Sequence, residues 1–362
     1  MSVLIFIFVL VVLVVGHELG HFVAAKWAKM RVLEFGVGFP PKVFGKRFGS
    51  SETEYTLNWL PFGGFVRIFG EDPAESGPGA FGEQSKWKQA LVLFAGPGAN
   101  FVLAFLLTTT ALMIGTVTTI EASERESARD VRVLVAEVVP DSPAERAGLV
   151  RGDQVLSLAS GDERVEVLNP KDIQDVVARS TSDVTLTVRR SGEEQVVVVA
   201  PTTGLIHNDP SRRAIGVATA LVGVVAYPPH EAVVRGLSAT YENTVLVAVS
   251  LATLLAQAFT FSADLSQVAG PVGIASLTGE AATFGVGALL SFAALLSINL
   301  GIINLFPFPA LDGGRLLFLG VEAATRRKIP YRVAGALNTV GFALLILLMV
   351  AVTVGDIGRL LS

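Results

Sequence analysis

Long apolar segments dominate the pattern of hydrophobic and polar positions along this chain. Residues 3–25, about 90–118, about 288–305 and about 333–354 are almost free of charge, and a helix needs roughly 20 apolar residues to cross a bilayer. A cleaved signal peptide is the alternative for the first segment. However, that segment lacks a basic start and leads into polar residues rather than a small-residue cleavage site. The pattern therefore predicts a polytopic α-helical membrane protein with about four transmembrane helices.

Basic residues indicate which loops face the cytoplasm. Nine lysines and arginines lie between residues 26 and 88, and five more lie between residues 315 and 332. By the positive-inside rule both regions are cytoplasmic, and the segment from about 120 to 230 is outside. Residues 244–261 are also apolar, and they overlap the end of an amphipathic stretch at 227–250 that suits the outer membrane face. The charge pattern is consistent only if residues 244–261 do not cross, which favours a helix lying against the others over a fifth span.

Short alternating runs replace the long apolar segments within residues 131–203, and such runs are typical of β-strands. SPA at 142–144, AGL at 147–149 and GDQV at 152–155 resemble a bacterial PDZ domain, and residues 169–179 suggest a short helix. Domains of this type capture extended peptides or chain ends at a sheet edge. The resemblance therefore implies a peptide ligand, and a structural spacer is the alternative role.

Composition narrows the chemistry that the chain can perform. Hydrophobic residues make up 51% of the chain, charged residues only 17%, and the net charge is −4, which argues against a nucleic-acid partner. The chain has no cysteine, so disulfides, iron–sulfur clusters and thiolate zinc sites are excluded. Any transition metal must therefore be bound by histidine, aspartate or glutamate.

An unusual polar group, HELGH at residues 17–21, interrupts the first apolar segment. Side chains four residues apart share one face of a helix, so His17 and His21 can present two imidazoles to one metal ion. Glu18 lies beside them and can act as the general base, which is the arrangement of zinc peptidases. Ionisable residues within a membrane are costly and usually functional. The motif therefore favours a catalytic Zn²⁺ site over structural histidines.

A catalytic zinc ion usually has three protein ligands, so one more is expected. Asp312 lies just after the third apolar segment, in NLFPFPALDGG at residues 304–314. The two prolines cannot continue a regular helix, and the two glycines free the backbone, so the chain can turn Asp312 inward. HELGH and Asp312 both lie near the cytoplasmic end of their segments. Their matched depth favours a ligand over the alternative, an aspartate that caps the following helix at 313–323.

Together these motifs resemble the site-2 protease family of intramembrane zinc metalloproteases, most of all the bacterial regulator-of-sigma-E protease type. HELGH and NLFPFPALDGG carry the resemblance, with GPGAN at 96–100 and GPVGI at 270–274 as further matches. The resemblance implies Zn²⁺ bound by His17, His21 and Asp312, with Glu18 as the catalytic base and Asn304 bound to the substrate backbone. It also implies a β-hairpin at about 31–70 that dips into the membrane and clamps an extended substrate. An ordinary cytoplasmic hairpin is the alternative.

The resemblance implies hydrolysis of peptide bonds in transmembrane segments of single-pass membrane proteins, such as an anti-sigma factor after a first cut. The expected location is the bacterial inner membrane, with the active site near the cytoplasmic side and the PDZ-like domain outside. The expected partners are the transmembrane substrate, the lipid bilayer and a peptide ligand of the PDZ-like domain. A scaffold without activity is one alternative, but it has no reason to keep all four site residues. A divalent-metal transporter is another, but internal repeats with paired broken helices are not visible.

The predicted layout has four parts. They are residues 1–120 with two transmembrane helices and the hairpin, 128–204 with the PDZ-like domain, 205–284 with a linker and membrane-surface helices, and 285–362 with two further transmembrane helices.

Overall fold

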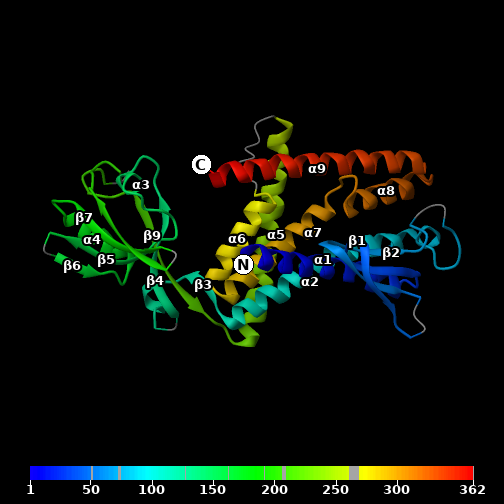
Figure 1. Cartoon of the computed structure of the whole chain (residues 1–362), viewed down its shortest axis with the longest axis horizontal. Coiled ribbons are helices and arrows are strands. Elements are labelled where there is room, and N and C mark those ends of the chain that lie inside the picture. Colours follow the sequence, from blue (N-terminus) through cyan, green and yellow to red (C-terminus); the bar gives the residue numbers. More distant parts are fainter. Residues whose placement is uncertain are drawn as a thin grey trace. The chain divides into compact units, whose positions relative to one another are not determined.

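The computed structural model describes the whole chain except residues 50–51, 72–74, 127, 162, 191, 206–208, 261–268 and 362. The described chain forms two compact units (Figure 1). One consists of Met1–Ile114 and Pro228–Ser362, and the other of Gly115–Tyr227. A β-rich unit is thus inserted into a helical one.

The first unit is built from helices, and the longest of them correspond to the apolar segments. They are α1 (Ser2–Trp27), α2 (Lys86–Ile114), α5 (Pro229–Phe259), α6 (Pro271–Thr283), α7 (Val286–Leu305), α8 (Asp312–Thr325) and α9 (Tyr331–Leu361). Small residues bring α1 and α2 together, because a Cβ at Gly20 would lie only 2.2 Å from the carbonyl oxygen of Ala95. The two backbones therefore nearly touch at the level of the HELGH motif.

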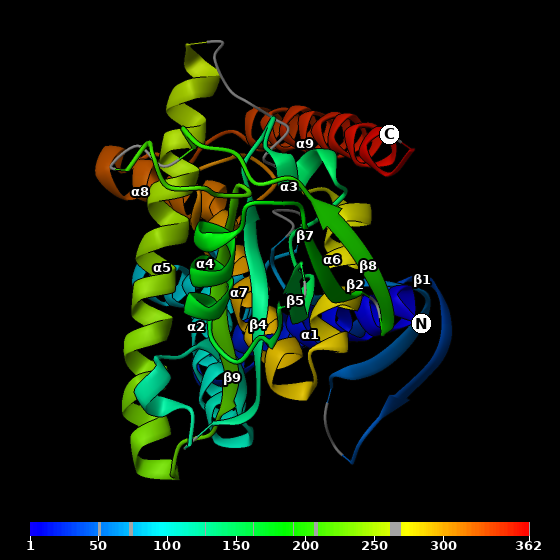
Figure 2. The same cartoon turned by 90° about the vertical axis from the view of Figure 1, so that its left-hand side faces the viewer.

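Five of the described helices, α1, α2, α5, α7 and α9, are long and apolar enough to cross a membrane by length and composition. Four of them match the predicted spans. The fifth, α5, joins the expected surface stretch at 227–250 and the apolar stretch at 244–261 into one helix. Its mean hydropathy of 1.3 is the lowest of the five, against 2.1 to 2.6 for the others. In both Figures 1 and 2, α5 runs across the direction of α1 and α9.

A buried carboxylate joins α9 to α6. Asp356 accepts hydrogen bonds from the backbone N–H of Gly270 at 3.1 Å and of Gly273 at 2.7 Å, and it pairs with Arg359 at 2.7 Å. Backbone N–H groups at the start of a helix have no partner within the helix itself. The GPVG run at 270–273 therefore gives α6 an N-terminus that Asp356 can cap.

A bent β-hairpin connects α1 to α2. Its strands are β1 (Val32–Arg47) and β2 (Glu54–Ile68), and a short turn of 3-10 helix (Phe81–Glu83) follows. Residues 34–37 of β1 pair with residues 64–67 on one side and with 54–57 on the other, and residues 54–57 pair in turn with 44–47. Residues 64–68 thus form one edge of this sheet, and no further described strand pairs with them.

The second unit is a β-sheet domain. Its strands are β3 (Thr116–Thr119), β4 (Arg129–Val138), β5 (Gln154–Ser160), β6 (Glu163–Glu166), β7 (Val184–Arg190), β8 (Glu193–Val199) and β9 (Val217–Val225), and its helices are η2 (Ala122–Glu124), α3 (Pro143–Arg146) and α4 (Pro170–Arg179). The strand order is β3-β9-β4-β5-β7-β8, with β6 on β5. Alternating apolar side chains such as Val133, Leu158 and Leu186 fill the core. The short helix expected at 169–179 is confirmed as α4, with Asn169 as its N-cap.

This unit extends beyond the predicted limits of 128–204. β9 pairs with both β3 and β4, so the expected linker at 205–284 contains an interior strand, and the unit ends at Tyr227. The sequence of β9, VATALVGVV, is apolar at nearly every position, and a strand with both faces covered lacks the alternation that identifies half-buried strands. The boundary at 204 was therefore wrong.

Candidate active site

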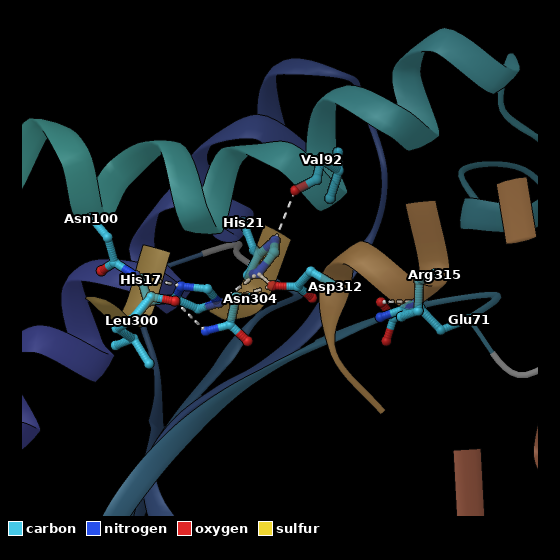
Figure 3. Close-up of polar contacts among 9 residues, drawn as sticks. All are labelled: His17, His21, Glu71, Val92, Asn100, Leu300, Asn304, Asp312 and Arg315. Atoms are coloured by element: carbon cyan, nitrogen blue, oxygen red, sulfur yellow. Dashed lines mark hydrogen bonds and ion pairs between the residues drawn. The ribbon is translucent and has the colours of Figure 1, made fainter. Parts of the chain in front are cut away.

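Two histidines from α1 and one aspartate from α8 converge inside the first unit (Figure 3). The Nε2 atoms of His17 and His21 lie 3.1 and 3.2 Å from the same Asp312 Oδ2, and 3.1 Å from each other. The side chains are largely buried, with 9%, 11% and 15% of their surfaces exposed. Three atoms that can each bind a metal therefore meet at one point, although Asp312 lies 295 residues from His17.

A break between α7 and α8 directs Asp312 toward the histidines. α7 ends at Leu305, and the two prolines that follow prevent it from continuing. Asp312 is the first residue of α8, and the N-cap is Leu311. The side chain of Asp312 lies beside the histidines, so Asp312 does not act as the N-cap of α8. Gly313 permits this path, because a Cβ there would lie 2.2 Å from the carbonyl oxygen of Phe306.

The hydrogen bonding of His21 leaves a lone pair at the meeting point. Its Nδ1 lies 2.7 Å from the carbonyl oxygen of Val92, which can only accept, so Nδ1 carries the proton. In a neutral imidazole, Nε2 then has a lone pair that faces the carboxylate of Asp312. Two such acceptors repel each other unless a positive charge lies between them. Two imidazole nitrogens and a carboxylate oxygen are also the ligands of known catalytic zinc sites, so these residues fit a zinc ion.

A cavity of about 290 Å³ opens beside this cluster, and all five predicted site residues line it. Glu18 follows His17 in α1 and lies against β2, because a Cβ at Gly64 would be 3.2 Å from Cγ of Glu18. Asn304, near the end of α7, donates from Nδ2 to the carbonyl oxygen of Leu300 at 2.9 Å. The predicted base and the predicted substrate-binding residue therefore line the same cavity as the three candidate metal ligands.

Some neighbours of the site have no counterpart among the predicted residues. Asn100 of α2 lies with Nδ2 3.0 Å from Nδ1 of His17, and Arg315 forms an ion pair with Glu71 at 3.1 Å on the cavity wall. The four-residue spacing of Gly96 and Asn100 in GPGAN is a signal that both lie on one helix face. An ion pair between residues 244 positions apart leaves no such local signal.

Known proteins resemble this chain over nearly its whole length. The family model for Peptidase family M50 matches residues 5–348. Zinc metalloprotease RasP of Oceanobacillus iheyensis is 30% identical over 446 residues, which covers 99% of each chain. RasP of Geobacillus kaustophilus is 30% identical over 442 residues, which covers 99% of this chain and 98% of its own. Protein CPE1693 of Clostridium perfringens is 34% identical over 347 residues, or 95% of each chain. The chain therefore belongs to peptidase family M50.

Proposed function

We propose that the chain is a zinc-dependent endopeptidase that hydrolyses peptide bonds within transmembrane segments of single-pass membrane proteins. The observation that carries this proposal is the convergence of His17, His21 and Asp312 on one point, with Glu18 in the same cavity. Membership of peptidase family M50 and the names of the RasP relatives support a zinc-dependent hydrolase.

Aromatic residues at the helix ends support a site below the membrane surface. Trp27 ends α1 and Trp87 lies in the first turn of α2; their rings are 5.9 Å apart, and both are exposed. Tryptophans are enriched at the level of the lipid headgroups. His21 precedes Trp27 by six residues, which places it roughly 9 Å deeper along the helix. With lysines and arginines on the same side, we place the site near the cytoplasmic face of a bacterial inner membrane, and the β-rich unit outside.

The chemistry divides among the site residues. His17, His21 and Asp312 would hold the zinc ion, which when bound polarises the scissile carbonyl and lowers the pKa of water to about 7. Glu18 accepts the proton of the attacking water and then donates it to the leaving amine. Asn304 hydrogen-bonds the substrate backbone and holds the scissile bond within the cavity. This division of roles is the one that the family resemblance implies.

The free edge of the hairpin supports the substrate clamp. Phe65, Val66 and Ile68 line the catalytic cavity, and residues 64–68 form the sheet edge described above. An extended substrate can add to such an edge as a further strand, which holds its carbonyl groups away from a helical conformation. Gly64 brings this edge into contact with Glu18, so an added strand would lie beside the proposed base.

Apolar side chains on the same hairpin support its place in the membrane. Those exposed on its described residues include Phe39, Val43, Phe44, Phe48, Leu57, Trp59 and Leu60. Monomeric proteins in water rarely gather this many large apolar side chains on the exposed faces of one hairpin. Lipid contact accounts for it, whereas an ordinary cytoplasmic hairpin does not.

The β-rich unit contains a groove that suits an extended peptide. A cavity of about 320 Å³ is lined by Ile173 and Val177 of α4, by the start of β9, and by Arg212 and Arg213. β3 pairs only with residues 222–225 of β9, so residues 217–220 have no partner on that side among the described strands. We propose that this groove binds a peptide end by strand addition, with an arginine near its terminal carboxylate.

The replacement of Glu18 by glutamine tests the proposed function. Purified wild type and Glu18→Gln would be compared in detergent with a tagged transmembrane peptide, with zinc content measured in parallel. We expect cleavage to fall by about 10²–10⁴-fold, the usual contribution of a general base, while zinc content is unchanged. Equal cleavage by both proteins would refute the role of Glu18. Zinc uptake undiminished after replacement of all three proposed ligands would refute the metal site. A scaffold or a transporter would show no cleavage in either protein.

A further inference from the structure

We propose that Asn100 is a positioning residue of the metal centre. Its carboxamide oxygen accepts a hydrogen bond from Nδ1–H of His17, which leaves the lone pair of His17 Nε2 free for the metal. This inference rests on the proposed function, because it requires His17 to be a ligand.

The contact between Asn100 and His17 is buried and close. Asn100 is 0% exposed, and its amide nitrogen as placed lies 3.0 Å from His17 Nδ1 (Figure 3). The amide oxygen is buried with no partner in the described structure. The oxygen and nitrogen of a carboxamide exchange places when the group is turned over. The contact itself therefore permits either donation to His17 or acceptance from it.

The metal distinguishes these two orientations. If Asn100 donates to Nδ1, the proton of a neutral His17 must be on Nε2, where it blocks metal binding. If the oxygen of Asn100 accepts, the proton is on Nδ1 and Nε2 has the free lone pair. A metal-bound histidine almost always donates its other ring N–H to an oxygen of this kind. Only the accepting orientation of Asn100 is therefore compatible with His17 as a ligand.

His21 shows the same arrangement with a different acceptor. Its Nδ1 faces the carbonyl oxygen of Val92 at 2.7 Å, and Val92 lies two helical turns before Asn100 on α2. One face of α2 thus supplies an acceptor to each histidine of α1. With both acceptors in place, both imidazoles direct a lone pair toward Asp312.

The backbone of Asn100 is fixed by α7. Ser297, also fully buried, donates from Oγ to the carbonyl oxygen of Asn100 at 2.8 Å. A Cβ at Gly301 would lie 3.2 Å from the carbonyl oxygen of Pro97 and 3.3 Å from Cβ of Asn100, so α2 and α7 are in close contact here. The carboxamide can therefore turn over but cannot move away from His17, which suits a positioning role.

Two substitutions separate the accepting role from the donating role. Asn100→Asp keeps the shape and can only accept, whereas Asn100→Leu keeps the approximate size and does neither. Thr109→Val is the matched control, because it also removes a buried polar group from α2. Thr109 contacts Gly236 of α5 and lies away from the site. Each full-length variant would be purified in detergent. Zinc affinity would be measured by chelator competition, and the visible spectrum would be recorded with Co²⁺.

We expect Asn100→Leu to bind zinc about 10–100-fold more weakly, the usual effect of losing such a partner, and its Co²⁺ spectrum to change. Asn100→Asp and Thr109→Val should stay within a few-fold of wild type. Equal weakening of the Asp and Leu variants would show that Asn100 donates, and wild-type affinity in Asn100→Leu would show that it has no role. Thermal unfolding in chelator would identify a misfolded Leu variant. In that case the zinc affinity of Asn100→Asp relative to wild type decides whether Asn100 accepts a hydrogen bond from His17. If wild type itself bound no zinc, the proposed function would fail instead.

Discussion

The replacement of Gly96 by alanine is expected to remove the metal site without unfolding the protein. A Cβ at Gly96 would lie 2.2 Å from Nε2 of His21, the atom proposed to bind zinc, and 2.6 and 2.7 Å from two ring carbons. This is 1.2 Å short of the 3.4 Å at which ordinary contacts begin. Every one of these nearest atoms belongs to the imidazole, which is the far end of a side chain. The ring should therefore swing aside while α1 and α2 keep their positions.

The magnitude follows from the tolerance of metal and catalytic geometry. Metal–ligand distances are defined to within about 0.2 Å, so a ring displaced by 1.2 Å is no longer a ligand. A misplacement of about 1 Å in a catalytic group can cost about 10²-fold in rate, or about 2.7 kcal/mol of transition-state stabilisation. We therefore expect kcat/KM to fall at least 100-fold, together with zinc affinity. Stability in chelator should hold or rise, because alanine is favoured over glycine within helices by about 1 kcal/mol.

The neighbouring glycine provides the control for this experiment. A Cβ at Gly98 would meet the ring of Phe94 at 3.5 Å, which is an ordinary contact. Gly98→Ala should therefore retain zinc and activity. Zinc content after dialysis, chelator competition, peptide cleavage and thermal unfolding would be measured for both variants. Wild-type zinc content and turnover in Gly96→Ala would contradict the proposed position of His21 at the metal. Loss of folding in chelator would contradict the expectation that only a side chain moves.

Two further predictions concern the bound peptides. The chain has no cysteine, so an introduced cysteine can report contact with the substrate. In a Glu18→Gln background, Val66→Cys should form a disulfide with a cysteine near the scissile bond of the substrate, whereas Trp59→Cys, which lies outside the cavity lining, should not. Equal crosslinking of both variants would argue against strand addition beside Glu18. In the β-rich unit, a labelled peptide with a free C-terminus should bind the full chain more tightly by fluorescence anisotropy than its amidated form. Arg213→Gln should reduce that difference, and indifference to amidation would refute recognition of a chain end.

The side chains of the HELGH motif in the candidate site were predictable because their signal is local. The spacing of His17 and His21 on one helix face needs no tertiary information, and a glutamate between them suggests a base. Asp312 required one further step, since prolines and glycines break the helix beside it and its depth matches. The structure brings all of these side chains to one cavity. Their roles in binding and catalysis remain predictions that the experiments above test.

The parts that were not predicted depend on pairing between distant segments. β9 belongs to the sheet because it pairs with β3 and β4, and its own sequence gives no alternation to show this. The acceptor for His21 is the backbone of Val92, which any residue type could supply. Asn100 contacts a histidine 83 positions away, so the GPGAN motif alone cannot indicate its partner. Similarly, α5 joins a surface stretch and an apolar stretch that the sequence pattern treats as separate, and its crossing of the membrane is untested.

The proposed function gives a physical reason for the position of the hairpin edge beside Glu18. In hydrocarbon a helix satisfies its backbone groups internally, and each group exposed without a partner costs several kcal/mol. A protease of transmembrane segments must therefore supply new partners where the substrate opens. Residues 64–68 present an edge that has no further partner among the described strands, and three of them line the cavity. Gly64 lets that edge contact the proposed base. The same strand that accepts the opened segment would thus bring its carbonyl groups to the catalytic residues, so unwinding and hydrolysis are expected to occur at one place.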